Sequence, residues 1–443
     1  MGLFDKFFSK DSEKIAQPDI RFGRYSDSYK TKEQYNAWDK SLELFEKQEY
    51  LASFRAFFDY LKDEETNNVI YTESKGQLEF QLIQGSKRIL GIANRKKVKA
   101  EAKIALTEDL NLGFMRRLME ENFKMRYSRF ALDKDNDITI VFDTPILDAS
   151  PYKLYYALKE VATKADKLDD LLIDEFEVLH HTDKTLQIPN SDIEKEVKYQ
   201  FVVEEVRDVL NEIEHGKLDV TQYPGGVAYL LLNLSYKLDY LTLPEGMLMD
   251  TLERIHRLYF SKDGKTNLQK NVMLQKEFRN LIRQPKEDFL RGMYRVKTSF
   301  GITKPVTHDR VVNFIDGELF QLDWYRDNGH YKVAMAIPGY IVGYCLFNYA
   351  LPKPDKEIFH LYYQIIYGDF FEKLGFRLNY IDHEKLIFNK KTIKRRIKRI
   401  GDLNREKYPK LNPDIQSLVF SSQVDFARSY LLMVRNLDLT KLG

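Results

Sequence analysis

The chain has 443 residues, of which 43% are hydrophobic and 31% charged; this composition indicates a globular protein of two or three domains and excludes a disordered chain. The 69 lysines and arginines nearly balance the 67 aspartates and glutamates, so bulk charge excludes a general polyanion binder and leaves only local basic patches. The single cysteine, Cys345, cannot form an internal disulfide, and we expect a reducing, cytoplasmic compartment.

Residues 1–31 are predicted to form an irregular segment. The stretch RFGRYSDSYK has the composition of a loop. The opening MGLFDKFFSK has no apolar core of the length that an export signal needs. We expect its three phenylalanines to lie in a short helix folded onto the protein rather than on a membrane.

Residues 32–175 are predicted to form one α+β domain that starts with a helical hairpin. Apolar residues recur at helical spacing on two successive faces between Lys32 and Lys62. The stretch LFEKQEYLASFRAFF resembles a single tetratricopeptide-type hairpin, and one such repeat cannot bury its own faces. We therefore expect the hairpin to pack on the residues that follow it.

Short runs with a period of two come next and predict an antiparallel sheet. Leu78, Phe80 and Leu82 alternate with polar residues, which is the pattern of a half-buried strand. A helix is expected over Asn111–Phe123. The predicted strands are Asn68–Ser74, Gln77–Gln84, Arg88–Ala93, Lys99–Leu106, Met125–Leu132 and Ile138–Phe142.

A long helix is predicted to close this domain. Ser150 is a favourable N-cap, and Pro151 occupies the first helical position, where a missing amide hydrogen costs nothing. Apolar residues then recur at alternating steps of four and three from Leu154 to Leu172. This stripe predicts a helix with one face in the core.

The order of these elements resembles a known fold. A helix ends in the pair Asn122 and Phe123, and it is followed by a strand, an acidic turn, a strand ending near a proline, and a long closing helix ending in the pair Ala165 and Asp166. Over about residues 45–175 this pattern is similar to the type III secretion chaperone fold, which YbjN-like proteins share. The resemblance implies a module that binds a segment of another polypeptide or dimerises, with no cofactor. Family members are usually small, free-standing and acidic, so this longer, near-neutral chain departs from them.

Residues 176–198 are polar and are predicted to be a linker to a mainly α-helical domain over residues 199–443. Within that domain the apolar run 333–351 contains Pro338, Asn348 and three tyrosines, so we expect a buried helix and no membrane span. The predicted helices are Phe201–Ile213, Val227–Tyr240, Met247–Phe260, Val272–Ile282, Lys332–Tyr349, Lys356–Leu374 and Val424–Leu437.

Three aspartates match half of a calcium loop. Asp133, Asp135 and Asp137 take its first, third and fifth positions, where alternate side chains converge on a hard cation. The sixth position is Ile138 instead of glycine, and the twelfth is Thr144 instead of glutamate. These departures predict that the carboxylates shape a hairpin turn.

His180 and His181 form the only adjacent histidine pair and fall in the predicted linker. No carboxylate or cysteine stands at ligand spacing beside them, so we expect a solvated pair rather than a metal site.

The sequence KKTIKRRIKR, residues 390–399, predicts an amphipathic basic helix with an isoleucine seam. Its cations can bind phosphates of a nucleic acid or an anionic surface, or they form a solvated face that pairs with acidic segments such as 169–177. The candidate anion-binding residues are Lys390, Lys391, Lys394, Arg395, Arg396, Lys398 and Arg399.

No nucleotide-binding or catalytic motif occurs in the sequence. The leading prediction is therefore a non-enzymatic adaptor, scaffold or chaperone-like protein with a protein partner, in which a homodimer is one form the partnership can take. The alternatives are nucleic-acid or anionic-surface binding through residues 390–399, and an enzyme whose pocket in the helical domain is lined by His256, His308 or His360 with carboxylates.

Overall fold

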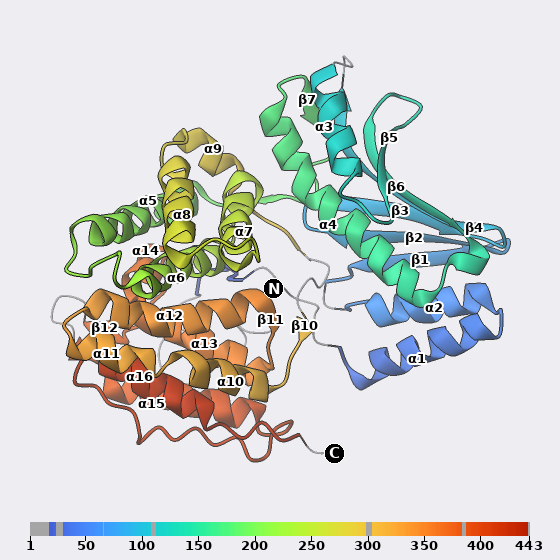
Figure 1. Ribbon diagram of the computed structural model, residues 1–443. Helices are drawn as coiled ribbons and strands as arrows, with labels where there is room; N and C mark the ends of the chain where they lie inside the picture. The colour runs from blue at the N-terminus through green and yellow to red at the C-terminus, as the bar shows by residue number, and fades with distance from the viewer. Residues whose placement is uncertain are drawn as a thin grey trace.

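The computed structural model describes residues 17–23, 30–64, 66–107, 112–297, 304–382 and 387–441. An α+β unit with an antiparallel sheet lies beside a mainly helical unit (Figure 1). Each unit has its own hydrophobic core, one built between Phe54 and Leu179 and the other between Phe201 and Leu437. The predicted fold class is confirmed. The prediction for MGLFDKFFSK lies outside the described residues.

Helices α1 (Lys32–Glu46) and α2 (Tyr50–Leu61) form the predicted hairpin. Thr31 caps α1 in a capping box with Gln34, which satisfies two backbone donors at the helix start. Between the helices, the hydroxyl of Ser53 donates to the carbonyl of Ser41 at 2.7 Å. The phenylalanines of α2 are buried in the core of the α+β unit, so the hairpin packs on the sheet domain as expected.

Seven strands form the sheet of the α+β unit. Their order is β1-β2-β3-β4-β6-β5, each neighbouring pair is antiparallel, and β7 pairs with one end of β4. Leu78, Phe80 and Leu82 are buried, as their alternation predicts. The strands are β1 (Val69–Ser74), β2 (Gln77–Gln84), β3 (Lys87–Ala93), β4 (Lys97–Thr107), β5 (Arg129–Leu132), β6 (Ile138–Pro145) and β7 (Leu179–His181).

Helix α4 (Pro151–Glu175) lies across the sheet and contacts β2, β3, β4 and β6 (Figure 1). The Ser150 side chain accepts a hydrogen bond from the backbone N–H of Lys153 at 3.3 Å, so the predicted cap forms. The whole predicted stripe from Leu154 to Leu172 is buried. A shorter helix, α3 (Leu112–Asn122), contacts β5, and the 3-10 turn η1 (Ile146–Asp148) precedes α4.

The carboxylate of Glu160 on α4 anchors the chain that enters β5. It accepts hydrogen bonds from the backbone N–H groups of Arg126, Tyr127 and Ser128, each at 2.9 Å, and from the Ser128 hydroxyl at 2.7 Å. Burial alone would raise the pKa of Glu160, but these donors stabilise the charged form and hold the pKa below its usual value.

We expect Glu160→Gln to lower the free energy of unfolding by about 1–3 kcal/mol at pH 7, because charge-assisted hydrogen bonds are lost. A carboxyl group with a lowered folded-state pKa stabilises the fold above its unfolded-state pKa, near 4.5, and that contribution is lost as the pH falls through the folded-state value. Urea denaturation of both proteins should therefore show a difference in the free energy of unfolding that becomes smaller as the pH is lowered. A difference that stays constant with pH would contradict this role of the charge.

Twelve helices are described in the second unit. They are α5 (Asp192–His215), α6 (Pro224–Thr242), α7 (Gly246–Phe260), α8 (Asn267–Leu281), α9 (Lys286–Arg291), α10 (His308–Glu318), α11 (Gln321–Asp327), α12 (Tyr331–Asn348), α13 (Lys353–Ile366), α14 (Gly368–Lys373), α15 (Lys390–Asn404) and α16 (Gln423–Arg435). Two-residue strand pairs join β8 (Ile188–Pro189) to β9 (Tyr294–Arg295), β10 (Lys304–Pro305) to β11 (Tyr349–Ala350) and β12 (Ile381–Asp382) to β13 (Ile387–Phe388).

The apolar run 333–351 forms most of α12, which is buried against α6, so the predicted buried helix is confirmed. Cys345 is fully buried within it. Among the described residues, no helix combines the length and the apolar character that crossing a membrane requires.

Helices α6 and α12 approach closely at Gly343. A Cβ atom there would lie 2.6 Å from the Cβ of Tyr236 and 2.8 Å from the hydroxyl oxygen of Tyr363. We expect Gly343→Val to cost about 3 kcal/mol of stability, at the upper end for an overpacked core, and to lower the melting temperature. Gly317→Ala is the control, because nothing lies within 4 Å of its added Cβ. Similar melting temperatures for the two variants would contradict the tight packing.

Residues 176–198 differ from the plain linker that the polar sequence suggested. They hold β7, which extends the main sheet, β8, which pairs with β9, and the first turns of α5. Backbone hydrogen bonds to distant strands order this segment, and a three-residue strand is too short to show a period in the sequence.

The acidic stretch after β5 forms the predicted turn. The side chain of Asp133 accepts hydrogen bonds from the backbone N–H groups of Asp135 and Asp137 at 2.8 and 3.0 Å. Asn136 has a φ of 64°, a left-handed conformation that asparagine tolerates.

Candidate functional site

A cleft of about 1500 Å³ lies between the α+β unit and the helical unit. Segment 17–23, α3, α4 and α7 contribute to its lining, and α13 and α15 form one continuous wall. Clefts between domains are common ligand sites, because side chains from two rigid bodies converge there.

Helix α15 turns one face of the predicted basic helix toward the cleft. Thr392, Arg395, Arg396 and Arg399 line it, and their spacing of three and four residues places them on one side of the helix. The isoleucine seam lies on a different side of α15 and is buried in the core of the helical unit. It consists of Ile393, Ile397 and Ile400. The predicted seam is therefore confirmed.

The other candidate residues of the basic helix lie outside the cleft lining. Lys394 donates a hydrogen bond to the side chain of Gln416 at 3.0 Å. Lys390, Lys391 and Lys398 are exposed to solvent. The structure thus divides the seven predicted cations into three that share a concave site and four that do not.

Helix α13 supplies the rest of this wall. Lys353, Lys356, Glu357 and His360 line the cleft at the same spacing of three and four residues, and α13 packs directly against α15. Arg377 joins them from the loop after α14. These residues were not predicted from the sequence as a site, although the helix predicted from Lys356 already placed several of them on one face.

The buried part of this wall is electropositive. Burial lowers the pKa of His360 to about 3, and the charges of Arg396 and Lys356 add to the effect. The neutral imidazole exchanges a hydrogen bond of 3.0 Å between its Nδ1 and the hydroxyl of Tyr240. Burial also lowers the pKa of Arg396, and Arg399 adds repulsion, while Tyr380 and Glu357 act in the opposite direction.

Carboxylates balance the cations on the facing side. Glu121 on α3 lies 2.5 Å from Arg117, 2.7 Å from Lys124 and 3.5 Å from Lys164. Burial would raise the pKa of Glu121, but these cations lower it to about 2, so the carboxylate stays charged.

The same balance holds where α4 meets α7. Lys167 lies 2.7 Å from both Asp250 and Glu253, and Arg257 lies 3.6 and 3.4 Å from the same two carboxylates. The two pairs of Lys167 also join the two units at the edge of the cleft, whereas the two pairs of Arg257 lie within α7.

The charge asymmetry is clear among the described lining residues. The wall of α13, α15 and Arg377 contributes six cations and one carboxylate, Glu357, whereas the rest of the lining contributes seven cations and seven carboxylates. The whole chain has a net charge of only +2. The excess positive charge is therefore concentrated on one wall, where the concave surface focuses it.

The three histidines considered for an enzyme pocket do not line this cleft together. His360 does, but His256 and His308 are not among its lining residues. The Nδ1 of His256 is 2.8 Å from the hydroxyl of Tyr236, and the Nδ1 of His308 is 2.8 Å from Asp355.

Two carboxylates of the acidic segment 169–177 pair with cations outside the basic helix. Asp169 is 3.0 Å from Lys87 and Asp174 is 2.9 Å from Arg291. Neither cation belongs to α15. Comparison of the chain with protein-family models and with curated proteins gives no match.

Proposed function

We propose that the cleft binds a phosphate-bearing anionic ligand through the wall of α13 and α15. The observation that supports this most is the composition of that wall, to which the described lining residues contribute six cations and one carboxylate, Glu357. Arg395 and Arg399 present planar guanidinium groups, which bind phosphate oxygens in pairs, and Lys353 and Lys356 add point charges nearby.

The shape of the site favours a small or single-stranded ligand. A cleft of about 1500 Å³ has walls on both sides, so bound phosphates would exchange water for fixed charges in a site of low dielectric constant. Apolar residues such as Leu168, Met249 and Leu378 also line it. They suit a ligand that has an uncharged part as well as its phosphates.

The proposal is tested by measuring binding of two probes at several salt concentrations. Fluorescence anisotropy with a labelled ten-nucleotide oligo-dT tests a single-stranded nucleic acid, and calorimetry with inorganic tripolyphosphate tests a small polyanion. We expect at least one probe to bind, with an affinity that falls as salt rises, because phosphate contacts release counterions. If neither probe binds at low salt, the proposal is wrong.

A protein partner is the second candidate, and the α3 helix favours it. Leu112 and Met119 are 90% and 68% exposed and lie seven residues apart on one side of α3, and Phe123, directly after the helix, is 93% exposed. Exposed apolar residues of this kind bind partner polypeptides. The resemblance to secretion chaperones points to the same kind of role, and β1 and β5 stand at the two ends of the sheet order, where strand addition takes place.

The two candidates separate when variants of each surface serve as baits in affinity purification from cells of the native organism. If a protein partner binds the exposed apolar residues at α3, the double variant Met119→Ser with Phe123→Ser should no longer capture that partner. The double variant Arg395→Gln with Arg399→Gln should still capture it. A partner lost with the arginine variant alone would assign protein binding to the cleft instead.

A further inference from the structure

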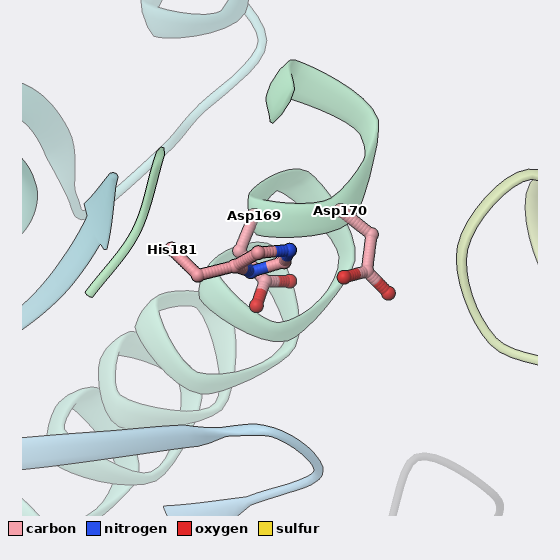
Figure 2. Close-up of side chains that lie close together, drawn as sticks. All are labelled: Asp169, Asp170 and His181. Atoms are coloured by element: carbon pink, nitrogen blue, oxygen red, sulfur yellow. The ribbon is translucent and has the colours of Figure 1, made fainter. Parts of the chain in front are cut away.

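A second group of polar side chains gathers where α4 meets β7. Asp169 and Asp170 from the helix and His181 from the strand each offer a ligand atom, and these atoms lie within 4.8 Å of one another. Figure 2 shows the imidazole of His181 beside the Asp169 carboxylate, with the Asp170 carboxylate next along α4. The expectation of a solvated histidine pair is met by His180, which is exposed, and not by His181.

Two atoms of this group have no hydrogen-bond partner among the described residues although both are buried. They are Oδ1 of Asp169 and Nδ1 of His181. Asp169 is 0% exposed. A buried carboxylate oxygen and a buried imidazole nitrogen without partners are costly unless something else satisfies them.

Neighbouring donors hold the carboxylates in place. The ammonium of Lys87 is 3.0 Å from Oδ2 of Asp169, and the hydroxyl of Ser86 donates to the same oxygen at 2.8 Å. The hydroxyl of Tyr294 donates to Oδ2 of Asp170 at 2.8 Å. Such outer contacts are typical of carboxylates whose other oxygen binds a metal ion.

The charge of the group also leaves room for a cation. Asp166, one turn earlier on α4, is buried as well and accepts hydrogen bonds from Gln84 and Ser86. Burial and the charge of Asp169 raise the pKa of Asp166 to about 7. Three buried carboxyl groups thus lie near Lys87, and a bound divalent cation would favour their ionised forms.

We propose that Asp169, Asp170 and His181 bind a divalent transition-metal ion. One imidazole nitrogen with two carboxylate oxygens suits Zn²⁺ or Mn²⁺ better than Ca²⁺ or Mg²⁺, which prefer oxygen ligands alone. Three protein ligands leave at least one position for water or another small ligand. This site is separate from the basic wall of the cleft and does not depend on the function proposed above.

The aspartates of the turn after β5 do not support a second site. The ammonium of Lys103 lies 2.8 Å from both Asp133 and Asp137, and Asp133 also binds two backbone N–H groups. Their charges already have partners, and no histidine takes part.

The test is metal binding by the full chain after treatment with a chelator and desalting. Calorimetric titration with ZnCl₂ and MnCl₂ should show one high-affinity ion per chain for at least one metal. His181→Ala should weaken binding at least about tenfold, as expected when a metal-site residue is lost. His180→Ala is the matched control, because it removes the exposed neighbour on the same strand. Equal binding by the His181→Ala and wild-type proteins, or no binding by the wild type, would overturn the proposal.

A spectroscopic measurement tests the same ligands without relying on the stability of the variants. Co²⁺ bound to imidazole and carboxylates in a site of low symmetry absorbs visible light, so Co²⁺ added to the wild-type and His180→Ala proteins should give a saturable absorption band. Asp170→Asn should lose the band while keeping the far-ultraviolet circular dichroism of the wild type. A band that persists in both Asp170→Asn and His181→Ala would place the ion elsewhere and contradict the assignment.

Discussion

Replacing Arg395 and Arg399 together with glutamine should weaken binding of oligo-dT or tripolyphosphate at least about tenfold, which corresponds to about 1.4 kcal/mol. Both side chains line the cleft from one face of α15, and α13 places Lys353 and Lys356 on the same wall. Glutamine keeps most of the side-chain length but removes the charge and the paired donors that bind phosphate oxygens. The dissociation constants should be measured with 1 mM EDTA present, so that the result is independent of any metal ion.

The matched control is the double variant Lys391→Gln with Lys398→Gln. It removes the same number of charges from the same helix, but these lysines are exposed and lie outside the cleft lining. We expect its affinity to stay within about twofold of the wild type, because exposed charges at a distance are screened. For oligo-dT, the arginine variant should also reduce the slope of log affinity against log salt by roughly 1.4, at about 0.7 per lost contact. Equal effects of the two double variants would show general charge attraction instead of a site.

Replacing Lys87 with methionine should lower the free energy of unfolding by about 3–5 kcal/mol, because it leaves a buried carboxylate without its cation. Lys87 is 2% exposed and its ammonium also donates to the carbonyl of Ile104 at 3.1 Å and to the hydroxyl of Thr182 at 3.4 Å. Burial raises the pKa of Asp169, and the charge of Lys87 opposes that rise. Urea denaturation at pH 8 in EDTA measures the loss.

Lys99→Met is the control for this prediction. Lys99 lies in the same sheet and pairs with Glu101 at 2.5 Å, but both side chains are 41% exposed, so the cost should be no more than about 1 kcal/mol. A similar small loss for Lys87→Met would contradict the view that a buried ion pair joins the sheet to α4.

Much of the α+β unit could be predicted because its signals are local. The stripe from Leu154 to Leu172 repeats with the period of a helix, and every member is buried in α4. The alternation in Gln77–Gln84 gave the bounds of β2 without error. The basic helix was also predicted correctly, since Ile393 and Ile397 form a seam that only a helix would align.

The cleft could not be predicted from such signals. It joins residues from Gln17 to Arg399, and periodicity says nothing about which helix faces approach each other across domains. The group proposed to bind a metal ion was missed for a related reason. Asp169 and Asp170 appeared to belong to a charged, solvated segment, yet they lie beside the apolar stripe of α4 and are buried under β7. The sequence did contain one indication of this buried group, because three acidic residues stand at positions 166, 169 and 170 of a helix that was predicted to face the core.

The most direct test of the anion-binding wall is an anomalous diffraction measurement on crystals soaked in sodium tungstate, with phosphate-free solutions. We expect a tungstate ion inside the cleft, within hydrogen-bonding distance of Arg395 or Arg399 and next to α13. Tungstate bound only on the outer face of α15, near Lys391 and Lys398, or no bound tungstate at all, would contradict it.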